Sequence, residues 1–471
     1  MKKVFIFFCS VCFTAQVSAQ QFSQYNTGTL FDSFENPSQR SFIPDSSRQF
    51  AFNFFIPNFN VNAYLTGNIQ PGIKSRLFAS PPYYNTSALQ IGQGKYNHFN
   101  GNLNAYSLMF KMFSSLNGDV EMGFSVQTKM ESRGLFSDES LALFSGPLNF
   151  PHQTYNDIFN DHYTFQSYHQ ISFSYREHID DNIALGIKIS GLLGIQYEKI
   201  DIAESHIIFD KIHDEAFLAM AGRYYNSFSG HSGYAPSFDN PGAAISIGTS
   251  YNTDDNITIQ ANLKDLGFIH WNNRSSIYNF NNSTTLTNIS SAAREDTIYN
   301  GIQKIFKHNG IVRSFTSATD SRAEVSVTKS YWLDADNQFK FSPTLLVSKE
   351  LFYPGFAGAF INHFQYNNFI FSATASYDDM NFFNIGAQAM IKSPNVEFFI
   401  GSDRLLNTGK FALASLNYSQ INRVGNYSGG NLFLGFSLKF GRIITHSMNS
   451  SYIPMGDADK GFFGRLFGNI F

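Results

Sequence analysis

The feature that most constrains this chain is a two-residue alternation near its end, over residues 431–441. One face of this stretch carries only apolar side chains, those of Leu432, Leu434, Phe436, Leu438 and Phe440. The intervening residues are Asn, Phe, Gly, Ser and Lys. A strand keeps these two sets on opposite faces and a helix does not, so the pattern predicts a half-buried β-strand. A strand of about ten residues that ends on an aromatic is typical of the closing strand of a transmembrane β-barrel.

The same alternation recurs through most of the chain. Residues 120–130 place Val, Met and Phe side chains opposite Glu, Ser, Gln and Lys. Short polar turns alternate with connections that are mostly long, as they do in outer-membrane barrels, which have an even number of strands. We therefore predict an all-β fold, a transmembrane antiparallel β-barrel of about 14 strands over residues 49–441, with both termini periplasmic. A further hairpin arm within residues 410–419 would raise the number to about 16.

Three local features accompany the strands. Pro57 interrupts the first strand and predicts a bulge or a break, because proline cannot donate to the ladder. Residues 201–241 are expected to form a long loop. Residues 272–320 form another long segment, in which residues 292–307 place Ile298, Ile302, Ile305 and Phe306 at helical spacing, so one amphipathic helix is expected there.

The beginning of the chain has the pattern of a secretory signal peptide. Lys2 and Lys3 precede an apolar run, and small residues lead up to Ala19, so residues 1–19 are predicted to be removed. Both cysteines, Cys9 and Cys12, lie within this segment. The mature chain is then expected to have neither a disulfide nor a thiolate metal site.

Residues 20–48 are polar and show no sustained period, and we expect them to form an N-terminal periplasmic or plug segment. The apolar side chains of Phe31, Phe34 and Phe42 favour folding back into the lumen. A barrel of this size has a lumen too wide for its own side chains to fill. The charged residues expected to face this lumen have both signs and predict a hydrated or plugged interior; they are Glu121, Lys129, Glu131, Arg176, Lys188, Glu198, Lys264, Glu324 and Lys340.

Residues 442–471 follow the closing strand as a C-terminal tail. Its end places Phe463, Leu466, Phe467 and Ile470 on one helical face, although nearby glycines weaken an isolated helix. This amphipathic segment is expected to need a surface, which could be the inner leaflet, the plug or a partner protein.

Composition supports the membrane assignment. Aromatic residues make up 17% and charged residues 15% of the chain, whereas soluble domains carry about 25% charged residues. Aromatic girdles at the two membrane interfaces account for such a surplus. Loss of Lys2 and Lys3 lowers the formal net charge from −3 to −5, and this mild acidity argues against a nucleic-acid partner.

Several motifs carry a family resemblance. The early motif, residues 34–38, contains Asn36 and Pro37; the central one, residues 265–271, contains Asp265, Gly267 and Trp271; residues 399–406 and the closing strand add to these. With these motifs the chain resembles an uncharacterised family of Bacteroidota outer-membrane barrels. That family is similar to the PorP/SprF-like and PorV-like proteins of type IX secretion and gliding, and more distantly to FadL-type barrels of 14 strands.

The resemblance implies two different roles. The secretion and gliding relatives imply a link to secretion machinery, whereas FadL-like barrels imply a path for a hydrophobic ligand. Residues 265–271 have two interpretations of their own. They could be a strand end with Trp271 in the aromatic girdle, which is the favoured interpretation, or a contact platform for the plug or a partner.

Candidate catalytic and metal motifs are weak. Residues 230–233, Gly-His-Ser-Gly, lack the last glycine and the strand-then-helix context of a nucleophile elbow. His162, His169 and Asp161 could suggest a surface hydrolase, but chance explains scattered histidines better. Residues 457–461 open like a calcium loop without its distal Glu. We therefore expect no catalytic, cofactor-binding or metal-binding residues.

The favoured hypothesis is a non-enzymatic outer-membrane barrel that serves as an accessory or structural subunit of an envelope, secretion or surface assembly. The alternative is a FadL-like transporter or channel for a small hydrophobic or other small molecule, gated by the N-terminal plug. An outer-membrane hydrolase has the least support. The expected partners are outer-membrane lipid, the barrel assembly machinery and other envelope proteins that contact the tail and loops, with no nucleic acid.

Overall fold

The structure is a computed structural model that describes residues 21–114, 119–180, 182–227, 235–378, 383–416 and 427–444. The predicted signal peptide and nearly all of the C-terminal tail, including Phe463, Leu466, Phe467 and Ile470, lie outside these ranges. So do residues 230–233 and 457–461.

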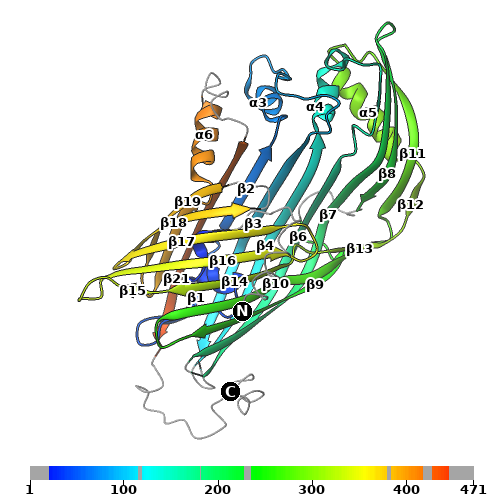
Figure 1. Cartoon of the computed structure of the whole chain (residues 1–471). Coiled ribbons are helices and arrows are strands. Elements are labelled where there is room, and N and C mark those ends of the chain that lie inside the picture. Colours follow the sequence, from blue (N-terminus) through cyan, green and yellow to red (C-terminus); the bar gives the residue numbers. More distant parts are fainter. Residues whose placement is uncertain are drawn as a thin grey trace, which may run out of the picture.

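The chain folds into a closed antiparallel β-barrel of 14 strands, which confirms the predicted fold class (Figure 1). The first wall strand is interrupted, and its two parts pair with β3 on one side and β21 on the other, so the cylinder closes without a free edge. The wall strands in chain order are β1 (Arg48–Phe52) continued by β2 (Asn58–Thr66), β3 (Tyr96–Ser114), β4 (Val120–Ser137), β6 (His162–Asp180), β7 (Ile183–Asp210), β9 (Pro241–Asn252), β10 (Ile257–Trp271), β14 (Arg322–Lys329), β16 (Phe339–Glu350), β17 (Phe356–Tyr366), β18 (Phe369–Asp378), β19 (Phe383–Lys392), β20 (Val396–Ser402) and β21 (Tyr427–Ile443).

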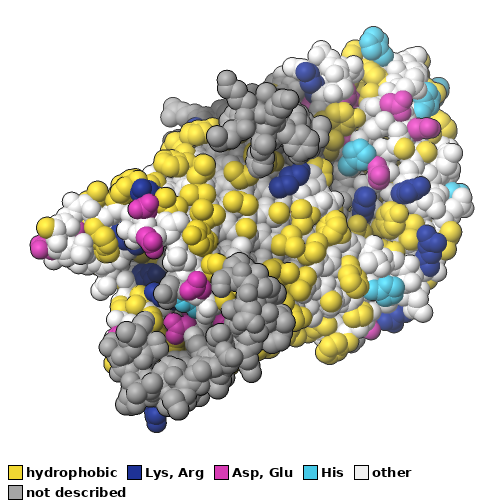
Figure 2. Space-filling model, turned by 60° about the horizontal axis from the view of Figure 1, so that its bottom comes forward, with side chains coloured by type: hydrophobic (Ala, Val, Ile, Leu, Met, Phe, Trp, Pro, Cys, Tyr) yellow, Lys and Arg dark blue, Asp and Glu magenta, His cyan; other side chains and the backbone are white. Residues whose placement is uncertain are grey.

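The alternation predicted for the closing strand is confirmed in β21. Leu432 and Phe440 are exposed on the outer surface, whereas Phe433, Ser437 and Lys439 are buried on the inner side. Exposed apolar side chains recur along the wall strands, and Figure 2 shows such side chains gathered over the strand surface. A closed barrel with this outer surface satisfies its backbone internally and presents apolar groups to lipid.

The break predicted at Pro57 is also confirmed. Residues 53–57 leave the ladder between β1 and β2, and their side chains Phe54, Phe55 and Ile56 are exposed on the outside. Asn53 seals the gap toward β3, because its side-chain oxygen accepts a hydrogen bond from the backbone N–H of Met109 at 3.0 Å. The interrupted segment therefore stays hydrogen-bonded to β3.

One end of the barrel carries the long connections, and we call the elements there the crown (Figure 1). The prediction that residues 201–241 form a loop is wrong, because β7 extends to Asp210 and pairs with a further strand, β8. Residues 201–226 also alternate between the two faces of the sheet. Here, however, the strands extend the sheet beyond the barrel wall. The connecting elements of the crown are β5 (Thr154–Asn156), β8 (Glu215–Asn226), β11 (Ser276–Thr287), β12 (Gly310–Val312), β13 (Phe315–Ala318), α3 (Gln70–Phe78), α4 (Asp138–Ser145), η2 (Pro147–Asn149), α5 (Arg294–Phe306) and α6 (Leu405–Leu416). At the opposite end, β15 (Tyr331–Trp332) pairs with β16 beside the turn between β14 and β16.

Two of the predictions for these segments can be judged directly. The helix expected over residues 292–307 is confirmed as α5, whose Ile298, Ile305 and Phe306 are buried against β8 and β11 in a hydrophobic cluster of the crown. The alternative hairpin arm within residues 410–419 is wrong, since residues up to 416 belong to helix α6. Leu405 and Ala412 stand seven residues apart, as do Leu406 and Leu413, and this spacing suits a helix better than a strand.

Residues 21–47 lie inside the barrel, and we call them the plug. The plug contains a short turn of helix, η1 (Phe22–Gln24), and α2 (Leu30–Glu35), which Thr29 caps by accepting a hydrogen bond from the backbone N–H of Asp32 at 3.1 Å. Leu30, Phe31, Phe34 and Phe42 are buried against inward-facing aromatic and aliphatic side chains of the wall. Each such side chain stabilises the packed state by roughly 1.5–3 kcal/mol.

Within the described ranges, no helix combines the length and the apolar character needed to cross a bilayer.

Candidate functional site

The described part of the chain contains a seat for the plug in the lumen and a cavity in the crown. The plug seat is polar. Most of the residues predicted to face the lumen do so: Glu121, Lys129, Glu131, Arg176, Lys188 and Glu324 are buried there, and Lys264 and Lys340 line spaces beside the plug. The prediction of a lumen with charges of both signs is therefore confirmed. The prediction is wrong for Glu198, because it lies where β7 pairs with β8 in the crown and accepts a hydrogen bond from the Tyr224 hydroxyl at 2.6 Å.

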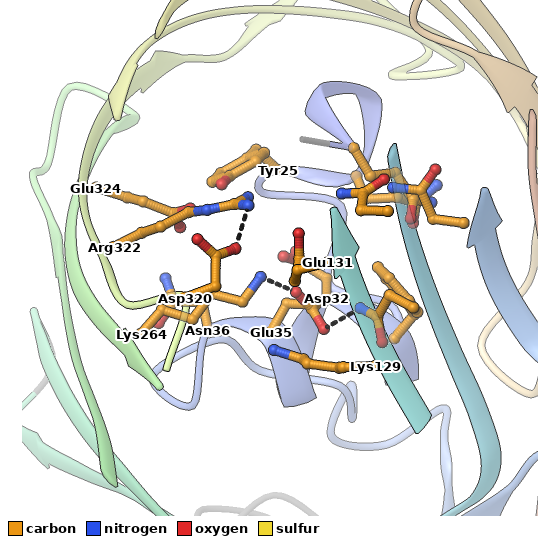
Figure 3. Close-up of a pocket in the computed structure, with 16 residues that line it drawn as sticks. Tyr25, Asp32, Glu35, Asn36, Lys129, Glu131, Lys264, Asp320, Arg322 and Glu324 are labelled. Atoms are coloured by element: carbon orange, nitrogen blue, oxygen red, sulfur yellow. Dashed lines mark hydrogen bonds and ion pairs between the residues drawn. The ribbon is translucent and has the colours of Figure 1, made fainter. Parts of the chain in front are cut away.

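Glu35, the last residue of α2, is the plug carboxylate that contacts side chains of the wall on two sides. It forms an ion pair with Lys264 of β10 (Figure 3). It also accepts hydrogen bonds from the Tyr106 hydroxyl at 2.6 Å and from the Asn104 amide at 3.3 Å. Its backbone carbonyl accepts a further hydrogen bond from Asn262 at 3.1 Å. These contacts connect the plug to β3 and β10, on two sides of the lumen.

Asn36 and Pro37, from the early motif, rest on a flat area of the wall. Gly186 of β7 and Gly248 of β9 are direct cross-strand partners, and both face inward. A Cβ atom on Gly186 would lie 2.1 Å from the backbone of Pro37, and one on Gly248 would lie 2.3 Å from Oδ1 of Asn36. The plug can therefore approach the wall this closely only because both residues are glycine.

Asp265, from the central motif, occupies a β-bulge of β10. Its φ of 50° lies in the left-handed region, and the register between β10 and β9 shifts between Leu263 and Leu266. The bulge turns the Asp265 carboxylate inward, where it forms ion pairs with Lys129 and with Lys188, the latter at 3.1 Å. Together with Glu35, it balances the lysines of this part of the lumen.

Gly267 and Trp271 follow on the same strand. The favoured interpretation of Trp271 as a girdle residue is wrong, because its side chain is fully buried inside the barrel and its Nε1 donates to Ser317 Oγ at 2.8 Å. It packs beside Tyr197, with ring centroids 5.6 Å apart. Gly267 lies against β9, where a Cβ atom would come within 2.2 Å of the Ala243 carbonyl oxygen. The bulge at Asp265 explains the difference, since it shifts the alternation that would have put Trp271 outside.

A second charged cluster lies next to the first. Arg133 pairs with Asp320 at 2.5 Å and with Glu350 at 3.1 Å, and Arg322 pairs with Asp320 at 2.6 Å. Between this cluster and the plug there remains a cavity of only about 50 Å³, lined by Tyr25 and Glu131 among others (Figure 3). The plug therefore fills most of the lumen at this level.

The crown contains a larger and chemically different space, which we call the crown cavity. Its volume is about 600 Å³, and its lining is mostly apolar. Helices α3, α4 and α6 and the ends of β2, β3 and β4 supply the walls; representative residues are Ile73, Leu77, Phe78, Phe99, Leu141 and Phe411. Phe78 and Phe411 meet edge to face at 5.5 Å and join α3 to α6.

Cationic side chains of α3 also line the crown cavity. Arg76 forms two hydrogen bonds to the Glu295 carboxylate of α5, at 3.2 and 3.0 Å, and lies over the Tyr84 ring. Lys74 is almost completely buried, and burial lowers the pKa of its ammonium group to about 8. An apolar space with basic groups in its lining suits an amphiphilic molecule.

The weak catalytic candidates are not brought together. His162 Nδ1 lies 2.7 Å from Asp201, and His169 Nδ1 lies 2.9 Å from the Thr128 hydroxyl. Both histidines are on β6, where seven residues span roughly 23 Å. Asp161 instead accepts hydrogen bonds from the Ser137 backbone and the Ser140 hydroxyl, at 2.8 and 2.5 Å. Among the residues that the structure describes, no group of three His, Cys, Asp or Glu side chains could hold a metal ion.

Comparison with known proteins gives a family. Residues 42–403 match the model of a family described as "Family of unknown function (DUF5723)". The chain belongs to this family. No curated protein matches the chain.

Among solved structures, the chain is similar to FadL-type outer-membrane barrels. The toluene transporter TbuX of Ralstonia pickettii is 9% identical, with 87% of this chain and 93% of that chain covered and a TM-score of 0.40. The P. putida toluene transporter TodX is 7% identical, with 86% and 93% covered and a TM-score of 0.41. A Pseudomonas aeruginosa FadL homologue is 10% identical, with 91% and 100% covered and a TM-score of 0.39. Likeness at this level carries no argument about what this chain binds.

Sequence reasoning missed the crown cavity and the glycine pair under the plug. Gly186 and Gly248 stand at inward positions of strands whose neighbouring inward residues are Lys188 and Ser246, so an unexplained glycine at a lumen position was the available signal. The crown cavity has no comparable signal, because its lining comes from segments between residues 63 and 429 that only the fold brings together.

Proposed function

We propose that this protein is an outer-membrane barrel that binds a small apolar or amphiphilic molecule in the crown cavity, as a transporter or receptor for that molecule. The observation that carries the proposal is the space of about 600 Å³ lined by mostly apolar side chains. Ligand pockets commonly measure about 300–1,000 Å³ and combine apolar walls with a few polar groups. Lys74 and Arg76 supply such groups and favour an anionic head.

In this proposal the crown faces outward and both termini lie on the periplasmic side. The short turns at the opposite end support that orientation, since outer-membrane barrels have short periplasmic turns and longer extracellular loops. The plug then lies between the crown cavity and the periplasm, and onward passage of a ligand requires the plug to move.

The proposal can be tested with the neutral fluorescent probe N-phenyl-1-naphthylamine and purified protein in a maltoside detergent. The unmodified protein should show saturable binding, and Leu141→Asp should weaken it by at least tenfold, because the substitution puts a carboxylate into the cavity wall. Leu148→Asp is the matched control, since Leu148 lies on η2 and is 90% exposed. Equal binding by both variants would show that the probe does not enter this cavity.

A second function is supported by the filled lumen. A barrel whose plug leaves a cavity of only about 50 Å³ beside α2 suits a non-enzymatic accessory or structural subunit of an envelope assembly. The resemblance to an uncharacterised family of Bacteroidota barrels, which is in turn similar to proteins of type IX secretion and gliding, also favours this role. Affinity purification from native membranes tests it: a stoichiometric partner should be retained by the full chain and lost from a chain lacking residues 442–471. If no partner depends on the tail, this role is contradicted.

A further inference from the structure

The end of the lumen opposite the crown contains a third space, which we call the vestibule. Its volume is about 370 Å³. One side is formed by plug residues 26–28 and 38–43, and the other by side chains of β6, β9, β16, β17 and β19 close to the short turns. The vestibule is therefore separated from the crown cavity by the plug.

Charge distinguishes the vestibule from the rest of the lumen. Its lining includes four cations, Arg40, Arg176, Lys340 and Lys392, and neither aspartate nor glutamate. Elsewhere around the plug, lysines and arginines face carboxylates directly, as Lys264 faces Glu35. The vestibule thus gathers positive charge without a carboxylate in its own lining.

The four cations differ in how far the protein already satisfies them. Arg176 Nε donates to the Ser38 carbonyl at 2.8 Å, and its NH1 group lies 3.6 Å from Glu121. Lys392 donates to the Thr27 carbonyl. Arg40 and Lys340 form no ion pair with any residue that the structure describes; Lys340 lies over the Trp332 ring at 5.7 Å, and Arg40 is exposed.

Unpaired cations on both sides of a protein-walled space attract anions more strongly than they would on a flat surface. Low-dielectric walls focus the field of the charges into the space. Arg40 comes from the plug and Lys340 from β16, and both line the vestibule, so an anion in this space has a cation on the plug side and another on the wall side. Guanidinium and ammonium groups bind phosphate and carboxylate through charge-assisted hydrogen bonds.

We propose that the vestibule binds a small anion with more than one negative charge, carrying phosphate or carboxylate groups, and that Arg40 and Lys340 are its main contacts. The volume limits the ligand to a small molecule. The inference does not depend on what the crown cavity binds, because the two spaces share no lining residue.

Isothermal titration calorimetry on the full chain in a maltoside detergent tests the proposal, with pyrophosphate and citrate as separate probes. The unmodified protein should bind at least one of them saturably with a stoichiometry of one. Arg40→Gln combined with Lys340→Gln should weaken that binding by at least tenfold. Tighter binding of pyrophosphate assigns a phosphate ligand, and tighter binding of citrate assigns a carboxylate ligand.

The matched control combines Arg313→Gln with Lys307→Gln, which removes the same charges from exposed positions of the crown. This control should bind like the unmodified protein. Arg40 is exposed and Lys340 is only partly buried, so the test variant should still fold, and heat-modifiable migration on gels checks this. The proposal is overturned if neither probe binds the unmodified protein saturably, or if the control weakens binding as much as the test variant.

Discussion

The plug seat and the crown cavity lie in one barrel but are built in opposite ways. The plug seat is charged and almost filled, with Glu35 and Asp265 each paired with lysines from other strands. The crown cavity is apolar and has about 600 Å³ of space. Buried charges hold a segment in one place because breaking a pair is costly, whereas an apolar cavity imposes little geometry on what enters. The comparison indicates that the lumen is organised to hold the protein's own chain, and the crown to accept another molecule.

Removal of the plug should have the largest effect. A chain that lacks residues 21–47 should form an open, water-filled pore, because a 14-strand barrel is too wide for its own side chains to close. Single-channel recording in planar bilayers should show stable conductance for this deletion and none for the unmodified protein. If the deletion variant folds and does not conduct, the plug is not what closes the lumen.

The charged pairs of the plug seat should matter for stability. Asp265→Asn leaves the buried ammonium groups of Lys129 and Lys188 without their shared carboxylate, so the free energy of unfolding should fall by about 3–5 kcal/mol. Urea unfolding followed by tryptophan fluorescence measures this change. Asp210→Asn is the control, since Asp210 is half exposed in the crown and solvent screens its pair with His213, so the free energy of unfolding should change little.

The glycine pair under the plug offers a more selective test. Gly186→Leu should push Pro37 away from β7, because even a Cβ atom would lie 2.1 Å from its backbone. The expected result is a plug that protease cleaves at least tenfold faster while the barrel stays intact. Gly191→Ala on the same strand has open space around its Cβ and should leave cleavage unchanged. Equal protection in both variants would mean that the plug does not need this surface.

The crown cavity should respond to pH through Lys74. Burial lowers the pKa of this lysine to about 8, so its positive charge is present below that pH and is lost above it. Binding of the anionic probe 8-anilinonaphthalene-1-sulfonate should therefore weaken by about fivefold between pH 7 and pH 9. A loss of this size corresponds to one charge pair that contributes roughly 1 kcal/mol to binding. The neutral naphthylamine probe should show no such change, and Lys74→Met should abolish the dependence. A pH dependence that survives in Lys74→Met rules out Lys74 as its source.

The smallest expected effect concerns the wall of the crown cavity. Burial raises the pKa of Asp161 to about 6, and this carboxyl group holds Ser137 and Ser140, which line the cavity. Because the folded state favours the protonated form of Asp161, this group stabilises the fold fully below about pH 4. That contribution is lost as the pH rises through 6. Hydrogen exchange of residues 137–145 should therefore speed up modestly between pH 5 and pH 7, after correction for intrinsic rates. Asp161→Asn should remove this extra change; if it does not, another group titrates.

The strands of the wall could be predicted from the sequence better than the positions of the side chains that the wall encloses. The alternation in β21 and the proline between β1 and β2 predicted strands and a break, because each depends only on neighbours in the chain. Trp271 was predicted to lie in the aromatic girdle, but the bulge at Asp265 shifts the alternation and turns its side chain inward. A single residue in the left-handed region does not change the sequence pattern, so the bulge could not be predicted. The strands β8 and β11 were missed because the loop interpretation assumed that pairing ends where the membrane ends.

The sequence by itself determined a membrane-spanning barrel of antiparallel strands, since two-residue alternation can satisfy lipid on one side and a polar lumen on the other in few other ways. Tertiary structure alone decided which charges meet in the lumen. Lys129, Lys188 and Lys264 come from three strands, and only closure of the cylinder brings them to Glu35 and Asp265. The tertiary structure also forms the crown cavity and the vestibule, because their lining residues lie far apart in the chain. Spaces of this kind arise from the packing of distant segments, and no local pattern of residues records that packing.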